Sequence, residues 1–299
     1  MSALSEFSQV GLPRPLAFAH RGGAALRPEN TIEAFDHGLS LGADGLEFDV
    51  HLSRDGVAVI HHDDTLERTT NARGPVASCT ADELDRVDAG YWFTPEPTTP
   101  QPRYPYRGCG LGLPRLRDVL QRYQTARVIV ELKTPHRELA RRVIDDVRAA
   151  GAVERVALGS FYGRALQEAR RYEPRISTGA AQEETRWALY RSRLRWPLGR
   201  TKYQEFQVPI RAGSTVIVTP RFISHAHRAG LPVRVWTVDR AEEMQQLLEW
   251  GVDSIISDRP DVAVRVVREW AGRTSDFHGP VVNLGSMSTG TDESLSRTF

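Results

Sequence analysis

Charged side chains suited to a phosphodiester gather in four short stretches of this sequence, each at the end of a strand-like segment. The stretches are His20-Arg21-Gly22, Glu47-Phe48-Asp49, His62-Asp63 and Glu131-Leu132-Lys133. Grouped carboxylates repel one another unless a cation joins them, whereas arginine and lysine suit a phosphate. If the fold brings the stretches together, they predict a metal-dependent phosphodiester hydrolase.

The acidic segment 46–52 alternates between apolar and ionisable residues without a break. Because successive side chains of a strand point to opposite faces, Glu47 and Asp49 share one face and the apolar residues share the other. In a barrel, helices cover the outer face, so the acids must point into the interior or its mouth. The segment 127–133 repeats the pattern and places Glu131 on the inward face.

Glu47, Asp49 and Glu131 at one mouth would raise one another's pKa values, and a divalent cation removes that conflict. A ligand set made only of oxygen favours Mg²⁺, Ca²⁺ or Mn²⁺ over zinc, which prefers histidine and cysteine. The alternative is that Glu47 and Asp49 lie on the exposed face of an edge strand. The recurrence at Glu131 favours the metal site.

His20 and His62 end strand-like segments close to these acids. Phosphodiester cleavage needs one group to deprotonate the nucleophile and another to protonate the leaving alkoxide, and histidine titrates near neutral pH. Arg21 offers a planar fork to phosphate oxygens, and Lys133 offers a point charge. The other histidines of this region are interpreted as packed or surface residues: His37, His51 and His61.

Strand-like and helix-like segments alternate from residue 16 to residue 270. This alternation is typical of an α/β fold with a parallel sheet, and about eight repeats fit a closed (β/α)8 barrel of the TIM type. The expected strands are 16–20, 45–52, 57–62, 127–132, 155–159, 175–178, 205–208, 233–237 and 254–257. The expected helices are 31–41, 116–124, 138–150, 164–172, 182–195, 220–229, 241–250 and 261–270. At the first helix we expect Asn30 as the N-cap, Glu33 as its reciprocal partner and Gly42 at the end.

The chain divides into an N-terminal extension (1–15), a barrel (16–271) and a tail (272–299). Residues 63–114 interrupt the alternation and are rich in Pro, Gly, Thr and aromatic residues, which predicts a small inserted lobe after the second strand region. The tail is rich in Ser, Thr and Gly without periodicity, and we expect it to be disordered.

Composition narrows the class of protein. With 39 basic and 38 acidic residues the net charge is +1, which gives no electrostatic case for nucleic acid as a partner. No apolar run is long enough to span a membrane, and the start lacks a secretory pattern, so we expect a cytoplasmic protein. Cys79 and Cys109 are too few for a disulfide scaffold and are expected to be free thiols.

In this order and spacing, the motifs resemble those of the glycerophosphodiester phosphodiesterase family over nearly all of residues 16–262. The further matching stretches are Pro28-Glu29-Asn30-Thr31, Gly42-Ala43-Asp44, His62-Asp63-Asp64-Thr65-Leu66, Arg68-Thr69-Thr70, Val235-Trp236-Thr237 and residues 251–260. Two positions depart from the family pattern without touching the proposed chemistry. Ser254 stands where the family usually has Gly, and Ser257 where it often has Thr.

The resemblance implies a TIM-type barrel that hydrolyses glycerophosphodiesters to sn-glycerol 3-phosphate and an alcohol. It implies Glu47, Asp49 and Glu131 as metal ligands, with His20 and His62 as the acid/base pair. It also implies Arg21 and Lys133 as phosphate ligands, with Trp236 lining the glycerol side. The loss of any acid/base or ligand position would have favoured a non-catalytic phosphodiester-binding module, and none is lost.

Residues 187–202 interleave arginines with aromatic residues. Such a segment can make peripheral contact with an anionic membrane, or border a groove for an acyl chain. The substrate would then be a lysophospholipid, and the activity a lysophospholipase D or a sphingomyelinase D-like reaction. The simpler interpretation, which we favour, is a solvated helix whose arginine stems cover its own apolar face. A nucleic-acid binder built on this segment is disfavoured by the neutral net charge and the lack of a known motif.

Overall fold

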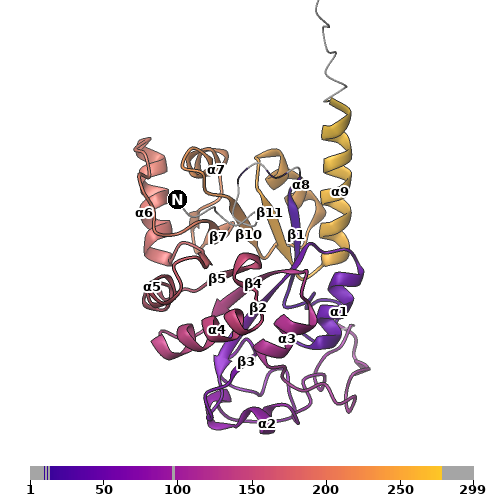
Figure 1. Ribbon diagram of the computed structural model, residues 1–299. Coiled ribbons are helices and arrows are strands. Elements are labelled where there is room, and N and C mark those ends of the chain that lie inside the picture. The colour runs from indigo at the N-terminus through magenta and orange to yellow at the C-terminus, as the bar shows by residue number, and fades with distance from the viewer. Residues whose placement is uncertain (1–9, 11, 13, 96–97, 278–299) are drawn as a thin grey trace, which may run out of the picture.

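Eight parallel strands form a curled sheet in the computed structural model, which describes residues 10, 12, 14–95 and 98–277 (Figure 1). Their order is β6–β5–β4–β2–β1–β11–β10–β7. A parallel bridge between Gly179 and Glu205 joins the two edges, so the sheet has the TIM-type arrangement expected from the sequence. The strands are β1 (Leu16–His20), β2 (Gly45–Leu52), β4 (Arg127–Leu132), β5 (Val156–Gly159), β6 (Ser177–Thr178), β7 (Phe206–Pro209), β10 (Val233–Trp236) and β11 (Ser254–Ser257).

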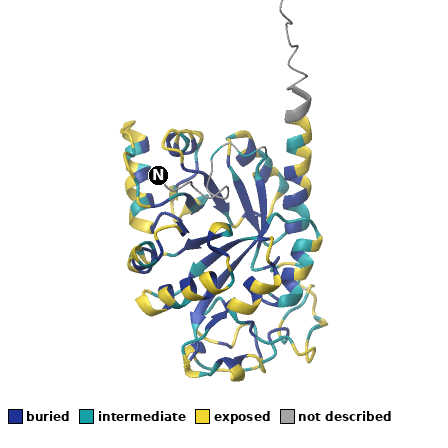
Figure 2. Ribbon diagram, in the orientation of Figure 1, coloured by how far each residue is buried: buried dark blue, intermediate teal, exposed yellow. Residues whose placement is uncertain are grey.

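Helices surround the sheet and carry exposed residues on their outward faces, whereas the strands of the sheet are largely buried (Figure 2). They are α1 (Ile32–Ser40), α3 (Leu116–Arg122), α4 (Arg137–Ala149), α5 (Gly163–Tyr172), α6 (Gln182–Leu194), α7 (Pro220–His227), α8 (Ala241–Glu249) and α9 (Pro260–Phe277). Every expected helix occurs. Helix α9 continues to Phe277, into the segment that was expected to be a disordered tail, and residues 278–299 lie outside the described residues.

The start of α1 differs from the prediction. The N-cap is Thr31, whose Oγ1 accepts a hydrogen bond from the Ala34 N–H at 3.2 Å, and Glu33 does not complete a capping box. Asn30 instead adopts a left-handed conformation with φ of 60°, which asparagine tolerates better than most residues. Gly42 ends the helix as expected, with φ of 92°.

The predicted alternation of β2 and β4 is confirmed. Leu46, Phe48 and Val130 are fully buried among helix residues on the outer side of the sheet. Inside the barrel lies a smaller apolar layer that includes Phe18 and Ile129. Burial of each large apolar side chain stabilises the fold by roughly 1.5–3 kcal/mol, which fixes the register and with it the inward direction of the acids.

Two additional segments of secondary structure follow strands of the barrel in the chain. After β2, β3 (Ala58–Ile60) pairs antiparallel with it, and the chain then carries a 3-10 helix (Val76–Ser78) and α2 (Ala81–Leu84), which pack on a small apolar cluster of their own. After β7, β8 (Arg211–Ala212) and β9 (Thr215–Val216) form a hairpin.

Helix α6 contradicts the simpler interpretation of the segment 187–202. Trp187 and Trp196 are 65% and 59% exposed, so arginine stems do not cover this apolar surface. One guanidinium that was expected to lie over the helix is bound elsewhere, because Arg191 Nη1 donates to the carbonyl of Leu198 at 2.8 Å. Among the described residues, no helix is long and apolar enough to cross a membrane. Cys79 and Cys109 are free thiols.

A buried ion pair lies beside the strands that close the barrel. Arg234 Nε is 3.1 Å from Glu205 Oε1, and these side chains are 1% and 0% exposed. Gln207 Nε2 also donates to Glu205 Oε1 at 2.6 Å, and Arg234 Nη1 donates to Ser254 Oγ at 2.6 Å. The pair therefore links β10 to β11 and to the residue preceding β7.

Replacement of Glu205 by Ala should lower the free energy of unfolding by about 3–5 kcal/mol, because it leaves a guanidinium charged and buried without its carboxylate. Urea denaturation measures the change. The control is Glu242→Ala, which removes an exposed partner of Arg240 and should cost less than about 1 kcal/mol. Equal losses in the two variants would contradict a structural role for the buried pair.

Candidate active site

Strand register brings the predicted site residues to one edge of the sheet. His20 at the end of β1 pairs with Glu47 in β2, and Asp49 pairs with Glu131 in β4. His62 follows β3 and returns to the same place, because the N–H of the preceding His61 donates to the carbonyl of Asp49 at 3.0 Å. The carboxyl ends of the barrel strands therefore carry the site, as in other TIM barrels.

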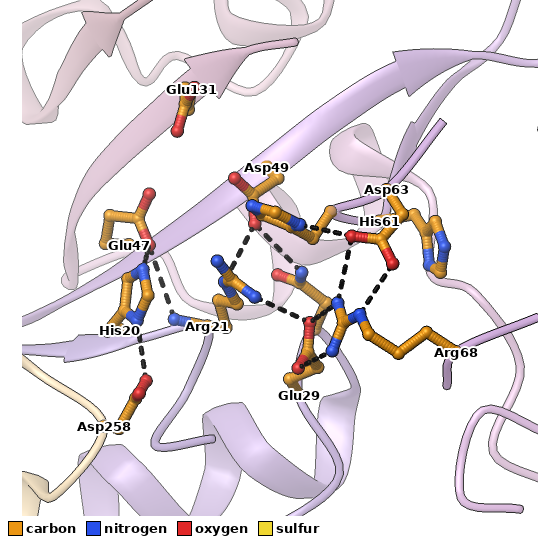
Figure 3. A network of polar contacts seen from close by, with 12 residues as sticks. His20, Arg21, Glu29, Glu47, Asp49, His61, Asp63, Arg68, Glu131 and Asp258 are labelled. Atoms are coloured by element: carbon orange, nitrogen blue, oxygen red, sulfur yellow. Dashed lines mark hydrogen bonds and ion pairs between the residues drawn. The ribbon is translucent and has the colours of Figure 1, made fainter. Parts of the chain in front are cut away.

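Three carboxylates meet there in a geometry that fits one cation. An oxygen of each of Glu47, Asp49 and Glu131 lies within 4.8 Å of the others. A cation at the usual 2.0–2.6 Å from its oxygen ligands reaches across about this distance, and the absence of nitrogen or sulfur from the set suits a hard ion. Figure 3 shows these side chains projecting from adjacent strands toward one another.

Burial and mutual repulsion set the charge of these acids. Burial raises the pKa of Glu47 and of Glu131 above the ordinary range. For Asp49 burial acts in the same direction, but Lys133 and Arg21, each 3.3 Å away, outweigh it and lower the pKa. In the absence of a cation the cluster thus disfavours the full ionisation of all three acids.

The two histidines are each oriented by a carboxylate. His20 Nδ1 lies 2.6 Å from Asp258 Oδ1, and its Nε2 lies 3.6 Å from Glu47 Oε2. Burial opposes protonation of His20, but Glu47 and Asp258 outweigh it and raise its pKa to about 9. His62 Nδ1 lies 2.6 Å from Asp63 Oδ1, and burial lowers the pKa of His62. Without a cation, the surroundings therefore shift the pKa values of the two histidines in opposite directions.

Arg68 connects the supports of two site residues. Its Nε lies 2.6 Å from Asp63 Oδ2, and its two terminal nitrogens donate to Glu29 at 2.8 and 2.7 Å. Glu29 in turn accepts a hydrogen bond from Arg21 Nη1 at 3.0 Å. Burial opposes ionisation of Glu29, but Arg68 and Arg21 outweigh it and lower the pKa to about 2. Asp63, which contacts His62, and Glu29, which contacts Arg21, thus both bind the guanidinium of Arg68 (Figure 3).

The part that several of these residues play in supporting the site was not predicted from the sequence. Asp63 adjoins His62, and that proximity was an available signal. Asn30, expected to cap a helix, instead donates from Nδ2 to Asp49 Oδ2 at 3.1 Å. Asp258 is 238 positions from His20, so only closure of the barrel reveals the contact. His51 and His61 are buried and bond to backbone carbonyls, in accord with their interpretation as packed residues.

A cavity of about 640 Å³ opens over the site. Seven of the eight predicted residues line it, and the remaining one, Asp49, is 1% exposed. Trp236 forms part of the wall and makes an edge contact with Phe161 at 5.8 Å between ring centroids. The wall continues away from the acids along α6 and the β8–β9 hairpin. The lining residues predicted from the sequence are His20, Arg21, Glu47, His62, Glu131, Lys133 and Trp236.

Replacement of Asp258 by Asn should lower the pKa of His20 from about 9 toward the ordinary 6.5, because it removes a negative partner. NMR titration of the metal-free protein measures it, with His62 as the internal control. Because the pKa of His20 is higher in the folded state than in the unfolded state, its protonation stabilises the fold. This contribution to the free energy of unfolding is complete below pH 6.5 and is lost as the pH rises through about 9. An unchanged His20 titration in the variant would contradict the assignment.

Comparison with known proteins agrees with this geometry. A model of the "Glycerophosphoryl diester phosphodiesterase family" matches residues 20–262. The glycerophosphodiester phosphodiesterase of Caldanaerobacter subterraneus subsp. tengcongensis is 30% identical over 261 residues, which cover 86% of this chain and 99% of that protein. The glycerophosphodiester phosphodiesterase of Bacillus altitudinis is 30% identical and covers 84% of this chain and 98% of its own length.

Solved structures are similar as well. The crystal structure of glycerophosphodiester phosphodiesterase from Agrobacterium tumefaciens superposes with a TM-score of 0.65 and 28% identity, over 83% of this chain and 98% of that one. The matched region of the family includes both histidines, all three carboxylates and most of the barrel that positions them. The chain therefore belongs to the glycerophosphoryl diester phosphodiesterase family and is an enzyme of that family, a phosphoric diester hydrolase.

Proposed function

We propose that the chain hydrolyses glycerophosphodiesters to sn-glycerol 3-phosphate and an alcohol, with Mg²⁺, Ca²⁺ or Mn²⁺ held by Glu47, Asp49 and Glu131. One observation carries the proposal: three carboxylates converge within 4.8 Å at a cavity that is also lined by both histidines. The near full-length relatives named glycerophosphodiester phosphodiesterase support the choice of substrate class.

The side chains divide the work of phosphoryl transfer. When bound, a divalent cation supplies charge neutralisation and polarisation of a phosphoryl oxygen. Arg21 and Lys133 bind nonbridging oxygens, and Trp236 lines the glycerol side. His20 and His62 act as the acid/base pair, one taking the proton of the nucleophile and the other protonating the leaving alkoxide.

His20→Ala and His62→Ala should each lower kcat for glycerophosphocholine by about 10²–10⁴-fold, because each removes one proton transfer. Enzymatic detection of sn-glycerol 3-phosphate measures the rate. EDTA should abolish turnover, and separate addition of Mg²⁺, Ca²⁺ and Mn²⁺ identifies the ion. The exposed His136, outside the cavity, gives the control His136→Ala, which should retain activity. Full activity of both site variants, or of the metal-free protein, would refute the proposal.

A lysophospholipid is a second candidate substrate, favoured by the apolar part of the cavity wall. This part is formed by side chains of α6, of β7 and of the residue after β9, which could enclose an acyl chain. These side chains include Leu189, Val208, Pro209 and Ile217. The reaction would release the headgroup alcohol by the same phosphodiester chemistry, as a lysophospholipase D does.

Leu189→Asp should discriminate between the two substrates, because it places a charge in the proposed path of the acyl chain. The ratio of kcat/KM for lysophosphatidylcholine to that for glycerophosphocholine should fall by at least about tenfold, or ~1.4 kcal/mol. Choline release measures both reactions. An unchanged ratio, or no hydrolysis of lysophosphatidylcholine by the wild type, would count against this second candidate.

A further inference from the structure

We infer that one face of the molecule, formed by α6 and the turn after it, docks on an anionic phospholipid bilayer. We call this surface the aromatic ridge, and it consists of Trp187, Tyr190, Leu194 and Trp196. The inference deepens the proposed function and rests on it, because the aromatic ridge adjoins the cavity that holds the phosphodiester site. The bilayer would be the source of a single-chain phosphodiester lipid.

The aromatic ridge is apolar and exposed. Its four side chains are 65%, 51%, 44% and 59% exposed, in the order of the sequence. Positions 187, 190 and 194 follow helical spacing and so lie on one side of α6, and the rings of Trp187 and Tyr190 meet edge to face at 6.0 Å. Four large apolar side chains exposed on one short segment are unusual on a protein that has no partner for them.

The end of the aromatic ridge is held in place. Arg195 ends α6 in a left-handed conformation, with φ of 59°. Arg191 Nη1 then donates to the carbonyls of Pro197 and Leu198 at 3.1 and 2.8 Å, and Leu198 packs on the apolar core. Trp196 therefore projects from an anchored turn, so docking would require little ordering of the backbone.

The charge around the aromatic ridge favours an anionic partner. Residues 185–204 contain no Asp or Glu. Several surface arginines on other helices are paired, as Arg141 and Arg171 are with Glu168, each at 2.7 Å. Within the described part of the chain, no carboxylate forms an ion pair with the arginines around the ridge. These arginines are Arg186, Arg193, Arg195 and Arg200. Aromatic residues beside unneutralised arginines are the composition of interfacial helices.

The aromatic ridge is also continuous with the cavity. Tyr190 belongs to both, and Arg186 and Arg193 on the same helix line the cavity wall. A bilayer lying on the ridge would thus meet the outer end of the cavity, whose inner end holds the two histidines. A lipid with one acyl chain could then enter without its chain crossing open water. A protein partner would not need this continuity.

The test is co-sedimentation of the full chain with sucrose-loaded vesicles of phosphatidylglycerol and phosphatidylcholine, compared with phosphatidylcholine alone. The wild type should bind the anionic vesicles preferentially and lose binding as salt is raised. Trp187→Ala combined with Trp196→Ala should weaken partitioning at least about tenfold. Arg195→Glu and Arg200→Glu should each weaken it at least about fivefold.

Two matched controls lie on other parts of the surface. Trp92→Ala removes a tryptophan that is 46% exposed on the segment 63–114, and Arg265→Glu reverses a charge on α9, which lies on the side of Figure 1 opposite α6. Both should bind vesicles like the wild type. The four ridge substitutions lie outside the cavity wall, so hydrolysis of soluble glycerophosphocholine should not change.

The outcomes separate the inference from the proposed function. Failure of the wild type to bind anionic vesicles, or equal losses in the controls, would overturn the docking surface. A dimer in solution that dissociates when Trp187 and Trp196 are replaced would also overturn it, in favour of a second copy of the chain. Failure to hydrolyse glycerophosphocholine would instead overturn the proposed function, whatever the vesicles show.

Discussion

The site depends on the repulsion of three carboxylates that strand register forces into one buried place. The apolar residues of β2 and β4 must face the helices, so Glu47, Asp49 and Glu131 must face inward. Two basic side chains of the protein partly offset this repulsion, since Lys133 and Arg21 both form ion pairs with Asp49. These same two cations are the ones proposed to bind phosphate. The acids therefore compete with the substrate for them, and a divalent ion among the acids would relieve that competition.

A second layer of charge fixes the geometry of the first. Asp258 stands behind His20 and Asp63 behind His62, each at 2.6 Å. A carboxylate at Nδ1 restricts both the rotation and the tautomer of an imidazole, so that Nε2 is the nitrogen left for chemistry. Arg68 adds a link between the two sides of the site through Glu29 and Asp63. Acidic and basic side chains alternate outward from the cavity. Many ionised groups can therefore be half-buried, because each has a partner of opposite charge.

How much of this could be predicted from the sequence depends on the range of the interaction. The alternation of β2 is local, and it predicted both the strand and the inward direction of Glu47 and Asp49 correctly. The cap of α1 was assigned wrongly because Asn30 and Thr31 are both good capping residues, and the choice was made by Asp49, which binds the Asn30 amide. Asp258 could not be identified, because its partner is brought near only when β11 pairs with β1.

The direction of long side chains was the other failure, and it concerns the part of the cavity wall that is proposed to select the substrate. The end of the cavity that holds the carboxylates is built on strands, whose pairing brings an oxygen of each acid to within 4.8 Å of the others. The wall farther along includes α6 and the β8–β9 hairpin, which lie outside the register of the barrel sheet. Arginine stems could have shielded Trp187, but Arg191 turns to a carbonyl instead. Membership of the family thus identifies the class of bond that is broken, while β-sheet pairing does not position the α6 side chains that are proposed to contact an acyl chain.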